Sequence, residues 1–367
     1  MAERITVSYQ KKPCYDIVLS NGFADLAQEF SRCEEWSNRK VCIVADSNVA
    51  PLYAQAVREA VAPYATTCEL FEFPAGEEHK TLDTVRDLYV FLIGHHFERR
   101  DLLVALGGGV TGDMTGFAAA TYLRGIDFIQ LPTTLLSMVD SSIGGKTGVD
   151  FDSYKNMVGA FHMPRLVYMN LDTLQTLEAR QYYSGFAEVM KHGLIKDSKY
   201  YEWLVACMYE ICDRDADTLR QLVKRSCEIK KSVVEKDPTE QGERALLNFG
   251  HTIGHAIEKY SDFTMLHGEC VALGCVAAAF LSWKKERISM EEYYEIRDMF
   301  VPFNLPISLE NIDVDRIVEL TRSDKKMRGG QIRFVLLDKI GKAVLDDTVT
   351  DAEMKAALEE LNFKEED

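Results

Sequence analysis

The chain has 367 residues, of which 47% are hydrophobic and 27% are charged, and its formal net charge is −16 at pH 7. This balance is typical of a globular chain that buries a large core, and the length favours about two domains. The negative charge disfavours non-specific binding to nucleic acid or to an anionic membrane, because both require a basic face. An anionic ligand must therefore meet a local group of lysines and arginines.

Cysteine usage and the absence of apolar targeting segments predict the compartment. The nine cysteines form no Cys-x-x-Cys pair, and most stand among apolar neighbours, which is typical of reduced core thiols in a cytosolic protein. Residues 1–18 contain no uninterrupted apolar segment of a secretory signal, and no later stretch approaches the roughly 18 apolar residues of a membrane span. We therefore expect a cytoplasmic protein.

The first half of the chain alternates short β-rich runs with helical periods. Strands are predicted at residues 40–46, 68–73, 102–106, 128–131 and 165–170. Val85, Leu88, Tyr89 and Leu92 follow the i, i+3, i+4, i+7 spacing of an amphipathic helix. Because buried parallel strands are apolar throughout and are joined by helices, the pattern predicts a parallel α/β sheet.

After about residue 175 the pattern changes to long helical segments. We expect helices at residues 178–195, 197–211, 216–235, 245–260, 266–285 and 289–300, and one β-hairpin formed by residues 332–337 and 342–345. The predicted fold is an α/β Rossmann-like N-terminal domain over residues 1–172 and a mainly α-helical C-terminal domain over residues 173–367. The active site is expected in the cleft between them.

A glycine-rich turn follows the strand predicted at residues 102–106. Gly107, Gly109 and Gly112 satisfy Gly-x-Gly-x-x-Gly, the spacing at which a tight turn brings backbone N–H groups and a helix N-terminus against a pyrophosphate. Such a match alone is weak, since many glycine-rich turns are only turns. Its place between a strand and a helix favours a nucleotide site.

The ribose-binding carboxylate of such a site must come from an unusual place. The glycine turn follows a late strand, and no well-placed acid stands about 20 residues downstream, where an ordinary Rossmann domain has it. Asp46, at the end of the strand at residues 40–46, is the natural candidate. Its alternative role is to cap a helix N-terminus.

The loop at residues 141–150 resembles a phosphate-binding P-loop only in part. The first glycine of that motif would fall at residue 140, which is Asp140, so an ATPase of this kind is not expected. Lys146 stands between glycines, beside Asp140 and two serines. This arrangement predicts a loop that binds an anion.

Glu188, Lys191 and His192 fall at i, i+3 and i+4 on one predicted helix face that is otherwise apolar. A carboxylate, an ammonium and an imidazole grouped in this way form either a functional site or a surface ion pair. Taken alone, the group favours the surface ion pair.

Three further histidines, of the eight in the chain, shift the interpretation towards a metal site. His251 and His255 lie one helical turn apart, the spacing at which two imidazoles can face one metal, and His267 opens the next helical segment. The spacing leaves open which two histidines bind. Glu188 with two histidines and a vacant position is typical of a catalytic metal, whereas a closed structural site usually has cysteines.

Basic residues near these motifs are candidates for binding an anion. Individually each is expected to be a solvated side chain, and the ones beside the glycine loops, Glu188 or the histidines are the stronger candidates. They are Lys146, Lys155, Lys191, Lys230, Arg244, Lys325, Lys326 and Arg328.

Seven segments occur in the order seen in 3-dehydroquinate synthases, which belong to the sugar-phosphate cyclases. They are GGGVTGDMTGFAAATYLRG, FIQLPTTLLSMVDSSIGGKTGVD, KNMVGAF, FAEVMKHGLI, LLNFGHTIGHAIE, LHGECVALG and DKKMRGG. The resemblance covers residues 40 to 345 approximately. It implies an NAD-binding α/β domain, a helical domain that carries Zn²⁺ or Co²⁺, and a homodimer.

The resemblance also implies a role for individual residues. The metal ligands would be Glu188, His251 and His267. NAD would be bound by Asp46, by Ala75, Gly76, Glu77, Glu78, His79 and Lys80, by Gly109, Val110, Thr111, Gly112 and Asp113, by Thr133, Thr134, Lys146 and Lys155, and by Thr173, Leu174, Gln175 and Thr176. The family often has tyrosine where this chain has His192.

For the sugar-phosphate substrate, the resemblance implies a set of polar and cationic residues. Catalysis would involve His255, Lys191, Asn248 and Lys146, and substrate binding would involve Arg124, Asp140, Asn156, Lys230, Arg244, Lys325 and Lys326. Arg124 would reach the phosphate site of a neighbouring subunit. Which of Lys325 and Lys326 contacts the phosphate stays open.

The reaction implied is conversion of 3-deoxy-D-arabino-heptulosonate 7-phosphate to 3-dehydroquinate and phosphate, a step towards aromatic amino acids in the shikimate pathway. Alternatives are a metal- and NAD-dependent polyol or glycerol-phosphate dehydrogenase, a sister sugar-phosphate cyclase, and a non-catalytic binding protein. Arg244, Asn248, Lys230 and His255 favour the dehydroquinate enzyme, whose substrate carries a carboxylate.

Overall fold

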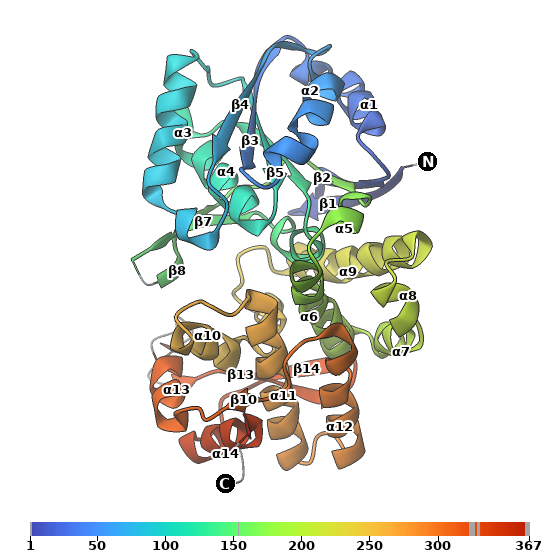
Figure 1. The fold of residues 1–367 in the computed structure, drawn as a ribbon, viewed down its shortest axis with the longest axis vertical. Coiled ribbons are helices and arrows are strands. Elements are labelled where there is room, and N and C mark those ends of the chain that lie inside the picture. Colours follow the sequence, from blue (N-terminus) through green and yellow to red (C-terminus); the bar gives the residue numbers. More distant parts are fainter. Residues whose placement is uncertain (1, 153, 323–326, 329–330, 364–367) are drawn as a thin grey trace. The chain divides into compact units, whose positions relative to one another are not determined.

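The computed structural model describes residues 2–152, 154–322, 327–328 and 331–363. The chain forms two compact units (Figure 1). Unit 1 comprises Met1–Leu177 and Lys230–Pro238, and unit 2 comprises Glu178–Ile229 and Thr239–Asp367.

Unit 1 is built on a seven-stranded sheet with the order β1-β2-β9-β6-β5-β3-β4. β1 pairs antiparallel with β2, and the other neighbouring strands pair in parallel. The predicted parallel sheet and its five predicted strands are confirmed. The strands are β1 (Glu3–Tyr9), β2 (Lys12–Ser20), β3 (Arg39–Asp46), β4 (Ala65–Phe73), β5 (Leu102–Gly107), β6 (Asp127–Pro132) and β9 (Leu166–Asn170).

Helices cover both faces of this sheet (Figure 1). They are α1 (Ala24–Arg32), α2 (Gln55–Val61), α3 (Leu82–Gly94) and α4 (Gly109–Thr121). The short α5 (Thr173–Thr176) follows β9. Along β3, Val41 and Ile43 pack with α1 and α2, whereas Cys42 and Val44 pack with α3 and α4. Because alternate residues of a strand face opposite sides, a strand buried on both sides is apolar throughout.

A separate antiparallel hairpin joins β6 to β9. Its strands are β7 (Lys146–Phe151) and β8 (Tyr154–Phe161). Val149 and the partly buried Val158 and Ala160 pack against the core on the α3 and α4 side of the sheet, whereas Tyr154, Met157 and Phe161 are exposed. This hairpin was not among the predicted elements.

Unit 2 is mainly helical, as predicted. Its helices include α6 (Ala179–Lys196), α7 (Ser198–Ala206), the short α8 (Met208–Cys212), α10 (His251–Tyr260), α11 (His267–Lys284), α12 (Met290–Asp298), α13 (Val314–Thr321) and α14 (Asp351–Leu361). α9 (Ala216–Lys236) belongs to unit 2 up to Ile229 and to unit 1 from Lys230. The predicted hairpin is formed by β13 (Phe334–Lys339) and β14 (Lys342–Asp346).

Two of the predicted helices are wrong as continuous elements. The segment at residues 197–211 is interrupted at Cys207, where α7 ends and α8 begins. The segment at residues 245–260 is a 3-10 turn over Glu243–Asn248 followed by α10. Gly250 separates them with a φ of +78°, a left-handed conformation that a helix cannot contain.

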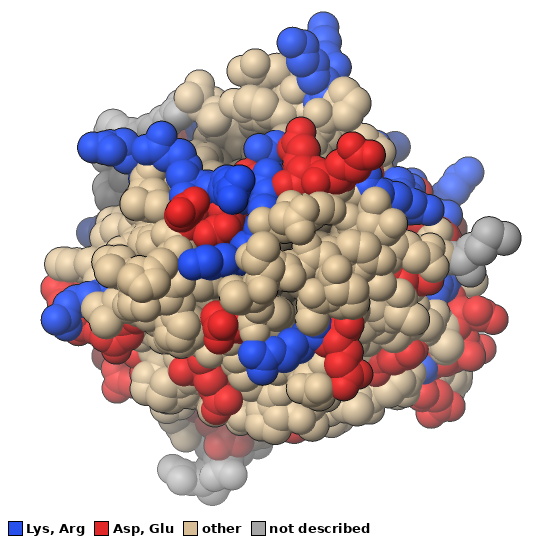
Figure 2. Space-filling model, turned by 90° about the horizontal axis from the view of Figure 1, so that it is seen from above, with Lys and Arg blue, Asp and Glu red and all other residues tan. Residues whose placement is uncertain are grey.

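The surface carries charged side chains of both signs. Basic and acidic side chains lie next to one another on the face shown in Figure 2. Among the ion pairs of unit 1, Arg39 lies 2.9 Å from Asp127, which also pairs with Arg165 at 2.8 Å. Among the described residues, no helix has the length and apolarity needed to cross a membrane.

Candidate functional site

The segments predicted to bind NAD follow the carboxyl ends of five parallel strands of unit 1. Asp46 ends β3, residues 75–80 follow β4, residues 109–113 follow β5, residues 133–134 follow β6, and residues 173–176 follow β9. Because the carboxyl ends of parallel strands meet at one edge of a sheet, the fold brings these segments to the same edge.

Asp46 and the glycine turn lie on neighbouring strands at the point where the chain changes direction across the sheet. From β3 the chain adds β4 on one side and then β5 on the other, so the position between β3 and β5 is a topological switch point, where ligands bind in such sheets. Thr111 Oγ1 donates a hydrogen bond of 3.2 Å to Asp46 Oδ2. Asp46 Oδ1 accepts from the backbone N–H groups of Asn48 and Val49, so the carboxylate also caps a turn.

The glycines at the start of α4 leave no room for side chains. A Cβ on Gly109 would lie 3.2 Å from Ser141 Oγ, and one on Gly112 would lie 2.7 Å from Gln130 Oε1. Gly112 therefore sets the close approach of α4 to β6, and Gly109 adds no side chain of its own at the N-terminus of α4. This cradle fits a pyrophosphate, because N–H groups at a helix start bind anions.

A buried lysine connects three of the predicted segments. Lys80 is 3% exposed, and its Nζ lies 2.7 Å from both Asp113 Oδ2 and Asn156 Oδ1. Burial raises the pKa of Asp113, and the ammonium of Lys80 opposes that shift. Lys155 Nζ lies 3.7 Å from Glu77 Oε1. The contacts join residues 75–80, α4 and β8.

The other predicted residues of unit 1 lie in different surroundings. Lys230 is 5% exposed, and its Nζ lies 2.7 Å from Asp140 Oδ1. Lys146 is exposed on β7. Arg124 is exposed in a turn where it and Leu123 both have positive φ, 70° and 49°, which is a strained backbone for such side chains. Lys325 and Lys326 lie outside the described residues.

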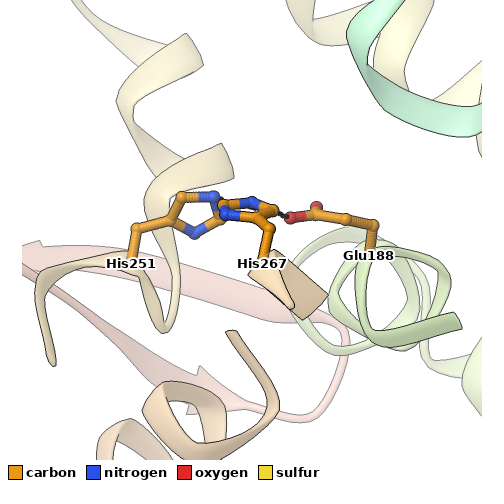
Figure 3. A group of neighbouring side chains, drawn as sticks. All are labelled: Glu188, His251 and His267. Carbon is orange, nitrogen blue, oxygen red and sulfur yellow. Dashed lines mark ion pairs between the residues drawn. The ribbon is translucent and has the colours of Figure 1, made fainter. Parts of the chain in front are cut away.

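Three helices of unit 2 bring a carboxylate and two imidazoles together (Figure 3). Glu188 is on α6, His251 begins α10, and His267 begins α11. Glu188 Oε1 lies 3.5 Å from His251 Nε2 and 3.6 Å from His267 Nε2, and all three ligand atoms lie within 4.8 Å of one another. This set of one oxygen and two nitrogens fits a divalent metal such as Zn²⁺.

The outer nitrogen of each imidazole has its own acceptor. His251 Nδ1 lies 3.1 Å from the carbonyl oxygen of Phe249, and His267 Nδ1 lies 3.6 Å from Glu258 Oε1. A carbonyl or carboxylate oxygen can only accept, so Nδ1 carries the proton in both rings. This leaves the Nε2 atoms, which face Glu188, as the nitrogens that would give their electron pairs to a bound metal.

The group Glu188, Lys191 and His192 is buried, so the surface alternative is wrong. The three side chains are between 0% and 1% exposed, and Lys191 forms an ion pair with Glu188 Oε2. Lys191 thus contacts one oxygen of the carboxylate, Oε2, whereas the two histidines face the other, Oε1.

The imidazole of His267 has a raised pKa. Burial lowers this pKa, but the carboxylates of Glu188 and Glu258 raise it by more, so that without a metal it lies at about 9.

The remaining predicted residues of unit 2 lie on or beside α10. Arg244 is buried, and Asn248 Nδ2 donates a 2.8 Å hydrogen bond to Glu240. The ring centroid of His255 lies 5.1 Å from that of His251 and 5.9 Å from that of His267. His255 thus borders the metal candidates.

Glu258 is a buried carboxylate of this cluster that was not among the predicted site residues. It is 2% exposed and lies with His255 and His267 in a second group of possible ligand atoms. The signal was its position, seven residues after His251 and three after His255, which places all three on one face of α10.

Comparison with known proteins identifies the family. Residues 70–184 match the N-terminal domain family of 3-dehydroquinate synthase, and residues 185–327 match its C-terminal domain family. The chain is 43% identical to the 3-dehydroquinate synthase of Acetivibrio thermocellus over 351 residues, which cover 96% of this chain and 97% of the relative.

Two solved structures share the whole fold. ValA, a 2-epi-5-epi-valiolone synthase from Streptomyces hygroscopicus subsp. jinggangensis solved with NAD⁺ and Zn²⁺, has a TM-score of 0.87 at 27% identity, covering 97% of this chain and 99% of its own. A 2-deoxy-scyllo-inosose synthase solved with carbaglucose-6-phosphate, NAD⁺ and Co²⁺ has a TM-score of 0.85 at 26% identity, covering 98% and 99%. With both family matches and a relative that is similar over nearly its full length, this chain belongs to the 3-dehydroquinate synthase family.

Proposed function

We propose that this chain is a 3-dehydroquinate synthase, a carbon–oxygen lyase. It would convert 3-deoxy-D-arabino-heptulosonate 7-phosphate to 3-dehydroquinate and phosphate through transient oxidation, elimination, reduction and aldol cyclisation. The observation that carries the proposal is the convergence of Glu188, His251 and His267 in a chain of this family.

Two bound groups belong to the proposal. Glu188 Oε1 and the Nε2 atoms of His251 and His267 would hold Zn²⁺ or Co²⁺, and the strand ends of unit 1, from Asp46 to Thr176, would hold NAD. When bound, the metal would polarise adjacent substrate hydroxyls, while NAD⁺ would take a hydride from carbon 5 and later return it. The relatives solved with NAD⁺ and Zn²⁺ or Co²⁺ support both assignments.

The cationic side chains would bind the two anionic ends of the substrate. Lys146, Lys230, Arg244 and Arg124 supply the positive charge that a protein of net charge −16 must concentrate locally. Holding both ends converts successive encounters into intramolecular steps. Asp140, Asn156, Asn248, Lys191 and one of Lys325 and Lys326 complete the proposed contacts.

His255 is the proposed proton carrier. An imidazole has an ordinary pKa of about 6.5 and can accept or release a proton near neutral pH. The ring lies beside the metal candidates without being part of the group formed by Glu188, His251 and His267. The oxygen of the leaving phosphate would take the proton next to the transient ketone.

The proposal includes a cytoplasmic homodimer. The cysteine usage of the sequence supports a reducing compartment. Exposed apolar side chains on the hairpin of β7 and β8, among them Phe151, Met157 and Phe161, support a surface that a second copy covers. Arg124, exposed and held in a strained turn, would reach the neighbouring active site.

The test is incubation with the heptulosonate phosphate, Zn²⁺ or Co²⁺, and NAD⁺ below the enzyme concentration. We expect phosphate and 3-dehydroquinate in equal amounts over many turnovers, without accumulation of NADH, and loss of both products in Glu188→Gln. Stoichiometric NADH would instead indicate a dehydrogenase. Phosphate release only from a substrate without a carboxylate would indicate a sister cyclase.

A further inference from the structure

A buried carboxylate stands directly behind one of the proposed metal ligands. Glu258, on the last turn of α10, is 2% exposed, and its Oε1 lies 3.6 Å from His267 Nδ1. The opposite nitrogen of the same ring, Nε2, lies 3.6 Å from Glu188 Oε1. The imidazole of His267 therefore lies between two glutamates, one on its inner and one on its outer side.

The two proposed histidine ligands are held in different ways. His251 Nδ1 faces a neutral backbone carbonyl, that of Phe249, at 3.1 Å. His267 Nδ1 faces a full negative charge. A carboxylate behind a ligating histidine fixes the ring orientation and the tautomer, and it makes the ligating nitrogen more basic than a carbonyl does.

The packing around Glu258 suits this role. A buried carboxylate is costly unless it is paired, so its place inside unit 2 requires a compensating partner. Its position on α10, seven residues after His251, is fixed by the helix itself. Gly254, between them, allows α10 to approach α11, since a Cβ there would lie 2.8 Å from the carbonyl oxygen of Cys270. The backbone thus sets the distance between Glu258 and His267.

We propose that Glu258 is a positioning residue that orients His267 for the metal and raises the metal affinity of this site. The inference rests on the proposed metal centre. Glu258 itself neither ligates the metal nor touches the substrate; it acts through His267 Nδ1.

The experiment measures Zn²⁺ affinity by chelator competition and the visible absorption of bound Co²⁺, on the full-length protein. Glu258→Gln keeps the shape of the side chain and removes its charge. We expect about 10–100-fold weaker Zn²⁺ binding, the usual effect of removing a residue that hydrogen-bonds to a metal-ligating histidine. The absorption spectrum of bound Co²⁺ should change as well. Glu29→Gln is the matched control, since Glu29 is also buried, 6% exposed, and paired with Arg4, but is not among the ligand candidates. It should bind both metals like the unaltered protein.

A double-mutant cycle separates positioning from general destabilisation. If Glu258 acts through His267, Glu258→Gln should have no further effect on affinity in a His267→Gln background, while its effect should persist with His251→Gln. Equal effects in both backgrounds, or Zn²⁺ affinity of Glu258→Gln within twofold of the unaltered protein, would overturn the proposal.

Two further measurements keep the result interpretable. If Glu258→Gln does not fold, Glu258→Asp, which keeps the charge, is measured instead. A loss of Zn²⁺ affinity that this variant shows in the His251→Gln background but not in the His267→Gln background supports the positioning role. Two Zn²⁺ per chain, with the second lost in Glu258→Gln, would overturn it, because Glu258 would then be a ligand. If the unaltered protein binds no Zn²⁺, the proposed metal centre itself fails.

Discussion

Gly274 of α11 lies so close to Gly250, the residue just before α10, that a Cβ on Gly274 would overlap the carbonyl oxygen of Gly250. A Cβ on Gly250 would in turn lie 2.7 Å from Cys275 Sγ. A second contact of this kind joins α11 to α6, because a Cβ on Gly268 would overlap the carbonyl oxygen of Ser184. The three helices that carry Glu188, His251 and His267 are therefore packed backbone to backbone, and their spacing sets the ligand distances.

Gly274→Ala should destabilise unit 2 and weaken metal binding together. The added methyl group has no space, and overpacking of this kind costs about 1–3 kcal/mol. Gly94→Ala is the control: Gly94 ends α3 and has nothing within 4 Å of an added Cβ, so its stability should change little or rise. Urea unfolding and Zn²⁺ titration of both variants are the measurements. Unchanged metal affinity in a folded Gly274→Ala protein would contradict the role given to this contact.

Removal of the metal should lower the melting temperature. A ligand that binds only the folded chain stabilises it by about 2.7 kcal/mol at a concentration 100 times its dissociation constant. Thermal unfolding with and without a chelator, and after adding Zn²⁺ back, measures this effect. Glu188→Gln should melt at the same temperature with and without Zn²⁺; a full response to Zn²⁺ in that variant would exclude Glu188 as a ligand.

The metal-free protein should lose stability as the pH rises from about 6.5 to about 9. The pKa of His267 is raised from 6.5 to about 9 in the folded chain: burial lowers it, and Glu188 and Glu258 more than compensate. The folded state therefore holds this proton more tightly than the unfolded state, a contribution that is complete below pH 6.5 and lost by about pH 9. Urea midpoints of chelated protein at several pH values test this. His267→Gln should lack this loss.

The affinity for Zn²⁺ should depend on pH in the opposite direction from the stability of the metal-free protein. Metal binding releases the proton from Nε2, so the affinity for Zn²⁺ should rise with pH over the same interval. Competition titrations at pH 6.5 and pH 8.5 measure it. An affinity independent of pH would show that His267 does not lose a proton to the metal.

Asp46→Asn should weaken NAD binding without unfolding unit 1. The amide keeps an oxygen for the N–H groups of Asn48 and Val49 but loses the charge that a ribose hydroxyl would bind, and hydrogen bonds to charged groups contribute about 1.5–3 kcal/mol. Asp101→Asn is the matched control. Asp101 is 3% exposed and accepts from the N–H groups of Lys40 and Glu98, a structural role alone. NADH fluorescence titrations should show weaker binding for Asp46→Asn and unchanged binding for Asp101→Asn.

The central strands were predictable because both of their faces are buried. Val41 to Ala45 are all at most 1% exposed, so the apolar run itself marks the strand.

The strands β1 and β2 were not predicted, because the turn between them has no recognisable sequence signal. Gln10 and Lys11 both have positive φ there, a conformation usually signalled by Asn or Gly. α14 was not among the predicted helices, although Thr350 and Glu353 form a capping box at its start and Met354, Ala357, Leu358 and Leu361 form its buried face.

The metal candidates show why spacing alone could not choose among the histidines. His251 and His255 are one turn apart, as a helical pair of ligands would be, yet the nitrogen that joins His251 near Glu188 comes from His267. The chain reverses between α10 and α11, and the approach of those helices depends on glycine contacts that have no periodic pattern. Family motifs supplied the choice, and helix packing supplies its physical reason.

The division of α9 bears on how the protein is made. Lys230, which pairs with Asp140 at 2.7 Å, and Glu235, which accepts from the backbone N–H of Ser8 at 2.7 Å, both belong to unit 1 although they follow Ile229 of unit 2. A ribosome that has released only the segment up to Leu177 has not yet delivered these partners. Unit 1 therefore reaches its complete set of contacts only late in synthesis, and a gene fragment that stops at Leu177 encodes unit 1 without the helix segment that contacts Asp140 and Ser8.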